Sequence, residues 1–288
     1  MTPRPTKYYQ IMSSTSNPTP PAPQSSALPP SHPFNTSDHD AATTQAARSS
    51  LPILSHKVTL DRKALLRLEL RDLSSNGTCA FLRLVHATHA LQHAVDVVLT
   101  HLYTSLPTTC IPPTRSVTLV LRDMDGVAYT TGMDLDNDHK EIHFNTNYIA
   151  QIDEARQKEE IMGVLVHEMV HCWQQAALGT APGGLIEGVA DWVRLKAGYA
   201  PPHWKRHGDC EWDAGYERTG YFLEWLEEKH GKDVVRRINE ALRDVEYDEK
   251  KLWHGCCGEG VGELWRKYQK SLGVKDPKDG EGETAECN

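Results

Sequence analysis

The sequence predicts one α+β domain over about residues 55–273, in which a small mixed sheet packs on helices. Stretches in which apolar and polar residues alternate predict short strands, and they fall in the first half of this region. Apolar residues at intervals of three and four predict helices, which make up most of the second half. Strands that gather before a run of helices are typical of the α+β class.

Residues 1–54 come before this domain and are rich in Pro, Ser and Thr. Nine of the chain's 17 prolines fall within residues 1–50, where large apolar side chains are few. Such a segment cannot bury enough apolar surface to offset the entropy lost on ordering, so we expect it to be disordered. It also lacks the apolar core of roughly 7–15 residues that a secretory signal contains.

Four stretches of the domain predict strands. They cover residues 58–70, 116–122, 127–131 and 141–148. Side chains two apart share one face of a strand, so Leu66 and Leu68 should point the same way. Asn76-Gly77 is typical of a turn or loop. Residues 134–139 predict an acidic turn and not an EF-hand, because they lack the Gly and Glu that a calcium loop needs.

Six stretches predict helices. They cover residues 80–106, 153–179, 185–198, 212–229, 233–242 and 261–272. In the second helix, Asp153 is the expected N-cap, and Leu178 belongs to the buried side before Gly179 ends the helix. Trp265 and Tyr268 of the last helix should pack inward.

Several histidines outside the main motif are better explained without a metal. Four of them lie on the first predicted helix, where no Glu base or carboxylate ligand accompanies them, and a polar face explains them. These four are His86, His89, His93 and His101. The short pattern His254-x-Cys256-Cys257 is expected to be a surface loop.

The segment His167-Glu168-Met169-Val170-His171 has the pattern H-E-x-x-H within an apolar run that predicts a helix. Positions four apart lie on one helix face, so His167 and His171 can bind one metal ion. Glu168 points to the same side and suits a base that acts on metal-activated water. Cys172 points about 100° away from His171 and is expected in the core. The alternative is an amphipathic helix with two hydrogen-bonded histidines.

A second helix, which follows the break at Pro182-Gly183-Gly184, supplies two carboxylates. Glu187 and Asp191 lie four residues apart on one face of an otherwise apolar stretch. Buried carboxylates are costly unless a positive group meets them, and a zinc ion for Glu187 and a ligand imidazole N–H for Asp191 would do so. The alternative is a solvated acidic face, with Asp191 paired to Arg194 or Lys196.

Together these two segments resemble the plant basic secretory protein family of zinc peptidases. The similarity lies in residues 167–171 and 184–191, continues in residues 198–204 and 212–216, and runs from about residue 55 to about residue 273. More distantly, the motif with its later Glu and Asp is similar to that of the thermolysin-like zincins. The resemblance therefore implies a zincin-like fold, with a helical C-terminal part that closes the cleft.

The resemblance also implies a set of roles. His167, His171 and Glu187 would be the Zn²⁺ ligands, Glu168 the general base, and Asp191 the partner behind one of the histidines. In zincins the strand before the zinc helix edges the cleft and pairs with the substrate backbone, so residues 141–148 are expected to do this by strand addition.

A zincin mechanism also needs a donor to the oxyanion that forms on the attacked carbonyl. Tyr216, Tyr199 and His203 are the candidates. Tyr216 is the first choice, because it lies on a predicted helix and within a segment similar to the family. Its alternative role is that of a core aromatic residue with a satisfied hydroxyl.

The expected activity is zinc-dependent hydrolysis of peptide bonds, on a peptide or protein substrate and by a monomer. Two alternatives stay open: a non-catalytic zinc-containing protein that binds peptides, and a zinc hydrolase of some non-peptide amide. The net charge of −8 argues against a nucleic-acid partner held through phosphates. No window approaches about 18 apolar residues, so no membrane span is expected.

The cysteines bear on the compartment. Their odd number and the adjacent pair do not predict a disulfide framework, which favours a reducing, intracellular compartment. Secretion stays open, because the family that the chain resembles is named for it. The seven are Cys79, Cys110, Cys172, Cys210, Cys256, Cys257 and Cys287. Residues 274–288 are rich in acidic residues, and we expect a disordered, solvated tail.

Overall fold

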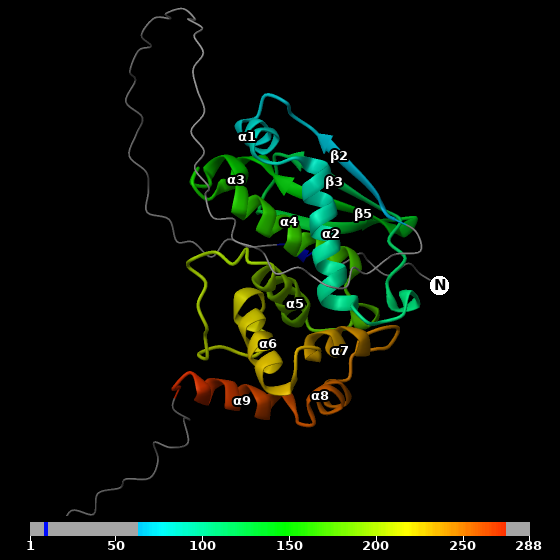
Figure 1. The fold of residues 1–288 in the computed structure, drawn as a ribbon, viewed down its shortest axis with the longest axis vertical. Helices are drawn as coiled ribbons and strands as arrows, with labels where there is room; N and C mark the ends of the chain where they lie inside the picture. Colours follow the sequence, from blue (N-terminus) through cyan, green and yellow to red (C-terminus); the bar gives the residue numbers. More distant parts are fainter. Residues whose placement is uncertain (1–8, 11–62, 275–288) are drawn as a thin grey trace, which may run out of the picture. The chain divides into compact units, whose positions relative to one another are not determined.

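The computed structural model describes residues 9–10 and 63–274, which form a mixed sheet covered on one face by helices (Figure 1). The strand order is β1-β4-β5-β3-β2. The parallel part consists of β2 (Leu65–Leu70), β3 (Ser116–Arg122) and β5 (Asp136–Asn145). On the other side of β5, β4 (Ala128–Met133) runs antiparallel, and β1 (Tyr9–Gln10) pairs antiparallel with β4. The sequence therefore predicted the α+β class and the mixed sheet correctly.

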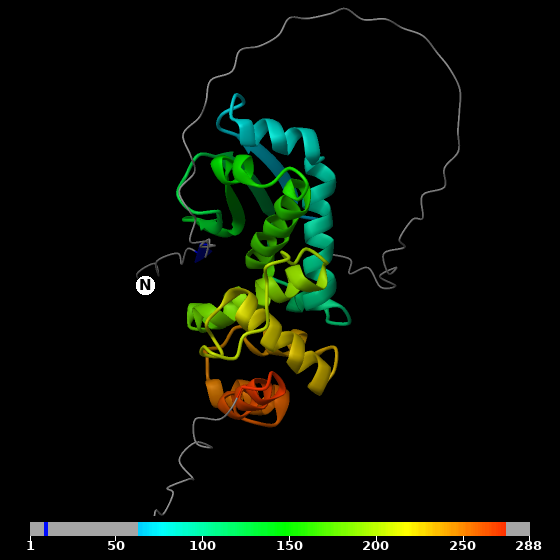
Figure 2. The same ribbon diagram turned by 90° about the vertical axis from the view of Figure 1, so that its left-hand side faces the viewer.

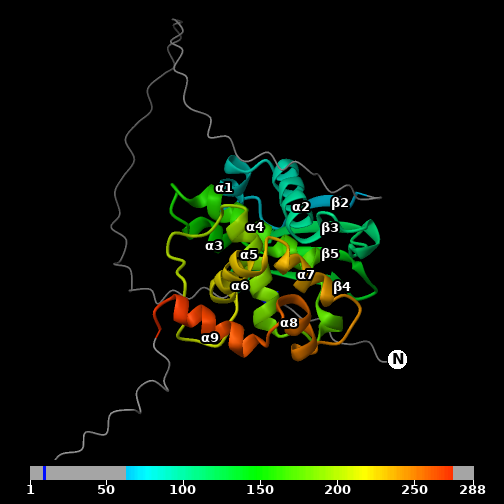
Figure 3. The same cartoon turned by 60° about the horizontal axis from the view of Figure 1, so that its bottom comes forward.

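The helices of the described part fall into two groups. The first lies with the sheet and comprises α1 (Asn76–Leu84), α2 (Ala87–Tyr103), α3 (Thr146–Gln151) and α4 (Gln157–Trp173). The second comprises α5 (Gly183–Lys196), α6 (Tyr216–His230), α7 (Val234–Ala241), α8 (Glu249–Cys257) and α9 (Val261–Ser271). Helices α6–α9, coloured yellow to red, gather at the end away from the sheet (Figures 1 and 2). Figure 3 turns this end forward and shows α6 beside α5.

Side-chain alternation decides which face of the sheet the helices cover. Leu119 and Leu121 of β3 and Ile142 and Phe144 of β5 have no exposed surface and face the helices. Leu66 and Leu68 of β2 pack against the same core, as predicted. Helix α4 lies between the sheet, α2 and α5, and most of its residues are buried. A helix with apolar residues around most of its circumference belongs in such a central place.

The sequence predicted one helix over residues 80–106, but the structure has two helices there, α1 and α2. Val85 and His86 between them have extended backbones, and α1 begins at Asn76, where a turn or loop was expected. Gly77 explains the position of α1. A Cβ atom at this residue would lie 1.9 Å from the carbonyl oxygen of Thr146, so α1 packs at backbone distance on α3. Val85 is buried, so the apolar pattern continues across the break and conceals it.

The predicted helix over residues 153–179 is shorter at both ends. Asp153 does not cap it; its carboxylate accepts the N–H of Ala155 in the preceding turn. The helix ends at Trp173, and Leu178 is 54% exposed with a φ of 53°. The N–H of Ala177 donates to the carbonyl of Leu242, so a contact with a distant part of the chain draws the backbone out of the helix.

Two further segments differ from the prediction. Strand β5 starts within the expected acidic turn and ends at Asn145, whose side chain caps α3 by accepting the N–H of Asn147. The expected surface loop at His254-x-Cys256-Cys257 belongs to α8. The carboxylate of Asp248 caps this helix and Gly258 ends it with a φ of 80°, so both signals were present in the sequence.

The sequence predictions for the two ends of the chain lie largely outside the described residues. These are the disorder expected of residues 1–54 and of the acidic tail, and the start of the first predicted strand.

Loop 199–210 and the inward packing of Trp265 and Tyr268 are as predicted, and α6 begins four residues later than the expected residue 212. Within the described part, no helix is long and apolar enough to cross a membrane.

A partly buried imidazole on α2 predicts a pH-dependent stability. His101 packs edge-on against Trp192, and burial lowers its pKa from 6.5 to about 4. The unfolded chain therefore binds a proton at a higher pH than the folded chain does. The free energy of unfolding falls as the pH falls from 6.5 toward about 4. The variant His101→Leu should lose less free energy of unfolding than the wild type between about pH 7 and about pH 5, by roughly 1–2 kcal/mol.

Denaturant titrations at both pH values measure this difference. His89→Leu, on the exposed side of the same helix, is the control. Equal pH dependence in the wild type and His101→Leu would contradict the prediction.

Candidate metal centre

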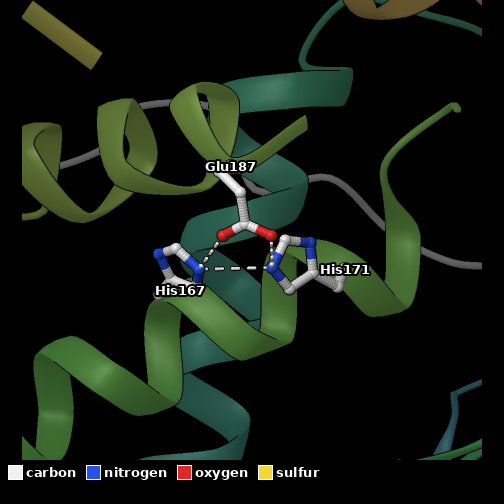
Figure 4. Close-up of side chains that lie close together, drawn as sticks. All are labelled: His167, His171 and Glu187. Carbon is white, nitrogen blue, oxygen red and sulfur yellow. Dashed lines mark hydrogen bonds and ion pairs between the residues drawn. The ribbon is translucent and has the colours of Figure 1, made fainter. Parts of the chain in front are cut away.

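Three side chains from α4 and α5 converge on one point (Figure 4). Nε2 of His167 lies 3.2 Å from Nε2 of His171 and 3.1 Å from Oε2 of Glu187. Nε2 of His171 lies 3.8 Å from Oε1 of Glu187. The ligand atoms all lie within 4.8 Å of one another, and this is the one group of its kind among the described residues.

This spacing fits a small divalent cation. Bonds of about 2.0–2.2 Å at tetrahedral angles place neighbouring ligand atoms roughly 3.3 Å apart. Lone pairs of two imidazoles and a carboxylate repel one another unless a proton or a cation lies between them. The residues present therefore suit a metal ion that takes nitrogen and oxygen ligands.

Asp191 holds the ring of His167 from behind. Nδ1 of His167 donates to Oδ1 of Asp191 at 2.6 Å, and this bond directs Nε2 of the ring toward the other two ligands. Asp191 is only 3% exposed, so the alternative of a solvated acidic face is wrong. Arg194 and Lys196 are not its partners, because they pair with Glu160 and Glu227, each at 2.9 Å.

Charge in the site is balanced between the imidazoles and the carboxylates. Burial alone would lower the pKa of His167, but Asp191 and Glu187 outweigh it and raise this pKa to about 10. Burial lowers the pKa of His171 to about 4. Burial alone would raise the pKa of Glu187, yet the two imidazoles reverse the effect and lower it. A divalent cation that enters here must replace the proton on His167, so its binding should weaken as the pH falls.

Glu168 lies beside the cluster and is completely buried. The hydroxyl of Thr130, on β4, donates to Oε2 of Glu168 at 2.6 Å, whereas Oε1 has no hydrogen-bond partner among the described residues. Burial raises the pKa of Glu168 to about 8, and the Thr130 hydroxyl opposes part of this shift. A carboxylate with a raised pKa and one free oxygen is equipped to accept a proton near neutral pH.

Of the three candidate oxyanion donors, Tyr216 contacts the cluster. Its ring stacks on that of His167, with 6.3 Å between the ring centroids. The hydroxyl of Tyr199 instead pairs with Nε2 of His93 at 3.1 Å, and His203 is exposed on the loop before α6. Cys172 faces the core, where it is 2% exposed, as expected from its position on the helix.

A cleft of about 660 Å³ opens beside His171. One wall is β4, with Thr130, Thr131 and Gly132, and another is the segment after α4, with Gln174 and Leu178. A pocket of this size is typical of ligand-binding sites.

The expectation that residues 141–148 edge the cleft is wrong. Strand β5 has β3 and β4 as neighbours on its two sides, so no backbone edge of it is open to a substrate. Strand β4 lies beyond β5 and forms the cleft wall instead. Thr130 on β4 was missed by the sequence analysis, because nothing local distinguishes it from any other threonine of a strand.

The fold and the three convergent ligands thus define an α+β protein with a candidate metal site between two helices. Residues 63–268 match the protein family described as BSP, peptidase of plants and bacteria, and the chain belongs to this family. The resemblance to the basic secretory protein family is thereby confirmed, and the match includes both α4 and α5. Neither the curated proteins nor the solved structures contain a match to this chain.

The contact between Thr130 and Glu168 predicts a stability difference. Thr130→Val keeps the shape of the side chain but removes the hydroxyl that donates to the buried carboxyl, so the free energy of unfolding should fall by about 1–3 kcal/mol. Thr130→Ser keeps the hydroxyl and should lose less. Chemical denaturation without added metal measures both variants, and a Val variant as stable as the Ser variant would contradict the role given to the hydroxyl.

Proposed function

We propose that this member of the peptidase family is a zinc-dependent metallopeptidase of the thermolysin-like zincin type. The observation that carries the proposal is the convergence of two imidazole nitrogens and a carboxylate oxygen at ligand spacing, beside a cleft. Two His and one Glu are the protein ligands of catalytic zinc in enzymes of that type, which keep a further position open. The substrate is a peptide or protein, and the protein acts as a monomer.

His167, His171 and Glu187 would hold the zinc ion. When bound, zinc supplies a Lewis acid that polarises a carbonyl and lowers the pKa of water. Asp191 keeps the Nδ1–H of His167 engaged, so the ring presents Nε2 to the ion. Because the donors come from two packed helices, their positions are set before any substrate arrives.

Glu168 acts as the general base. Its unpaired Oε1 accepts a proton from the attacking water and passes it to the leaving amine. The Thr130 hydroxyl holds the other oxygen, which fixes the plane of the carboxylate. The hydroxyl of Tyr216 donates to the oxyanion of the attacked carbonyl.

The substrate lies extended along the β4 wall of the cleft, with main-chain hydrogen bonds to that strand. Support comes from β1, whose Tyr9 and Gln10 pair antiparallel with Thr130 and Tyr129. The outer edge of β4 therefore accepts an extended chain close to Glu168, and a substrate that pairs with Tyr129 and Thr130 takes the place of Tyr9 and Gln10 there.

Replacing the proposed base, Glu168, should separate zinc binding from peptide cleavage. Glu168→Gln keeps the size of the side chain but accepts no proton, so turnover of peptides should fall by at least about 100-fold. Zinc content should stay that of the wild type, because Glu168 is not a ligand. Peptide cleavage assays and metal analysis on the same preparation measure both, and cleavage at the native rate would refute the mechanism.

The ligand set predicts the metal dependence. One zinc per chain should bind, and a chelator should stop the digestion of a mixed peptide pool until zinc is restored. Glu187→Gln should weaken zinc binding by more than about 10-fold, and Asp191→Asn by about 10–100-fold, because Asp191 acts through His167. Competition with a chromogenic chelator measures the affinities, with Glu154→Gln, at a 79% exposed side chain, as control. Peptide binding without products would favour the non-catalytic alternative.

A further inference from the structure

The start of α6 lies against one face of α5 at backbone distance. A Cβ atom on Gly184 would stand 1.6 Å from the carbonyl oxygen of Asp213, and one on Gly188 would stand 2.3 Å from Cγ2 of Thr219. Real Cβ atoms do not approach other atoms so closely. The turn before α6 can therefore occupy its place only because residue 184 is glycine, and the first turn of α6 only because residue 188 is glycine.

The same face of α5 carries the two site carboxylates. Gly184, Glu187, Gly188 and Asp191 follow one another at intervals of three, one and three, which places them on one side of a helix. Gly183, the neighbour of Gly184, faces open space, with nothing within 4 Å of a Cβ atom built there. The close approach is thus specific to the face that bears Glu187 and Asp191.

Thr219 closes the turn from the other side. Its side chain is fully buried, and its hydroxyl accepts the N–H of Gly215 at 2.9 Å and donates to the carbonyl of Trp212 at 2.8 Å. Within this turn Gly215 has a φ of 86° and Tyr216 a φ of 49°. A positive φ is unfavourable for a tyrosine, so the surrounding contacts must hold it there.

We infer that Gly184 and Thr219 are positioning residues for Tyr216. Gly184 lets the turn over residues 212–216 settle on α5, Thr219 locks that turn, and Tyr216 is thereby held in its unfavourable backbone conformation with its ring on His167. The inference rests on the proposed function, because it assigns these two residues to the oxyanion donor. The glycine-rich start of α5 would then contribute to catalysis, and would not only mark the end of the preceding loop.

Two matched pairs of full-length, zinc-loaded variants test this. In Gly184→Ala and Thr219→Val, kcat for peptide cleavage should fall by about 100-fold, as expected when an oxyanion donor is displaced by about 1 Å, with little change in KM. In Gly183→Ala and Thr219→Ser, kcat should stay within about threefold of the wild type. Zinc affinity should be unchanged in all four, because the ligands themselves stay in place.

A double variant separates positioning from general packing. Once Tyr216→Phe has removed the hydroxyl, adding Gly184→Ala should lower kcat little further, because both changes act on the same donor. If Gly184→Ala costs as much in the Phe background as alone, or if it weakens zinc binding, the inference is wrong.

Amide hydrogen exchange gives a readout that does not depend on activity. Exchange over residues 212–219 should be faster in Gly184→Ala and Thr219→Val than in their matched controls. If exchange speeds up while Tyr216→Phe keeps full kcat, the positioning stands and the oxyanion role in the proposed function fails. If exchange and kcat of Gly184→Ala equal those of Gly183→Ala, the positioning fails whatever Tyr216 does.

Discussion

One buried hydrogen bond, from Nδ1 of His167 to the carboxylate of Asp191, governs the geometry of the site. Both side chains are almost completely withdrawn from solvent, where a charge without a partner would cost several kcal/mol. The contact ties α4 to α5 and fixes the direction of the imidazole ring. Because the ring is fixed, its Nε2 atom points at His171 and Glu187 and not into the core. The candidate metal centre thus follows from the way in which the two helices cross.

The surroundings of α4 give Glu168 its chemical character. The sheet, α2 and α5 enclose the helix, so the carboxyl is removed from water and its pKa rises to about 8. Strand β4 supplies the Thr130 hydroxyl to one oxygen and at the same time forms a wall of the cleft. The sheet therefore does more than support the helix: it orients the proposed base and borders the space in which a substrate would lie.

Much of the fold could be predicted from the sequence, and the failures share a cause. Strands β3 and β4 and helices α5, α6, α7 and α9 lie close to their expected residue ranges, because alternation and helical periodicity are local properties. The break at Val85 and the end of α4 at Trp173 were missed. Contacts with distant residues lie near both sites: Gly77 of α1 packs on Thr146, and the N–H of Ala177 after α4 donates to the carbonyl of Leu242. The interior position of β5 was also beyond prediction, because strand order depends on pairing between remote segments.

Two pairs, His167 with His171 and Glu187 with Asp191, could be placed on one helix face each from the sequence alone. A spacing of four residues fixes this in any α-helix, whatever surrounds it. That the two faces meet, that Thr130 lies against Glu168 and that Tyr216 stacks on His167 follows from the folded arrangement. These contacts join residues 20 or more positions apart, and their formation depends on how glycines and apolar side chains let the helices and the sheet approach one another.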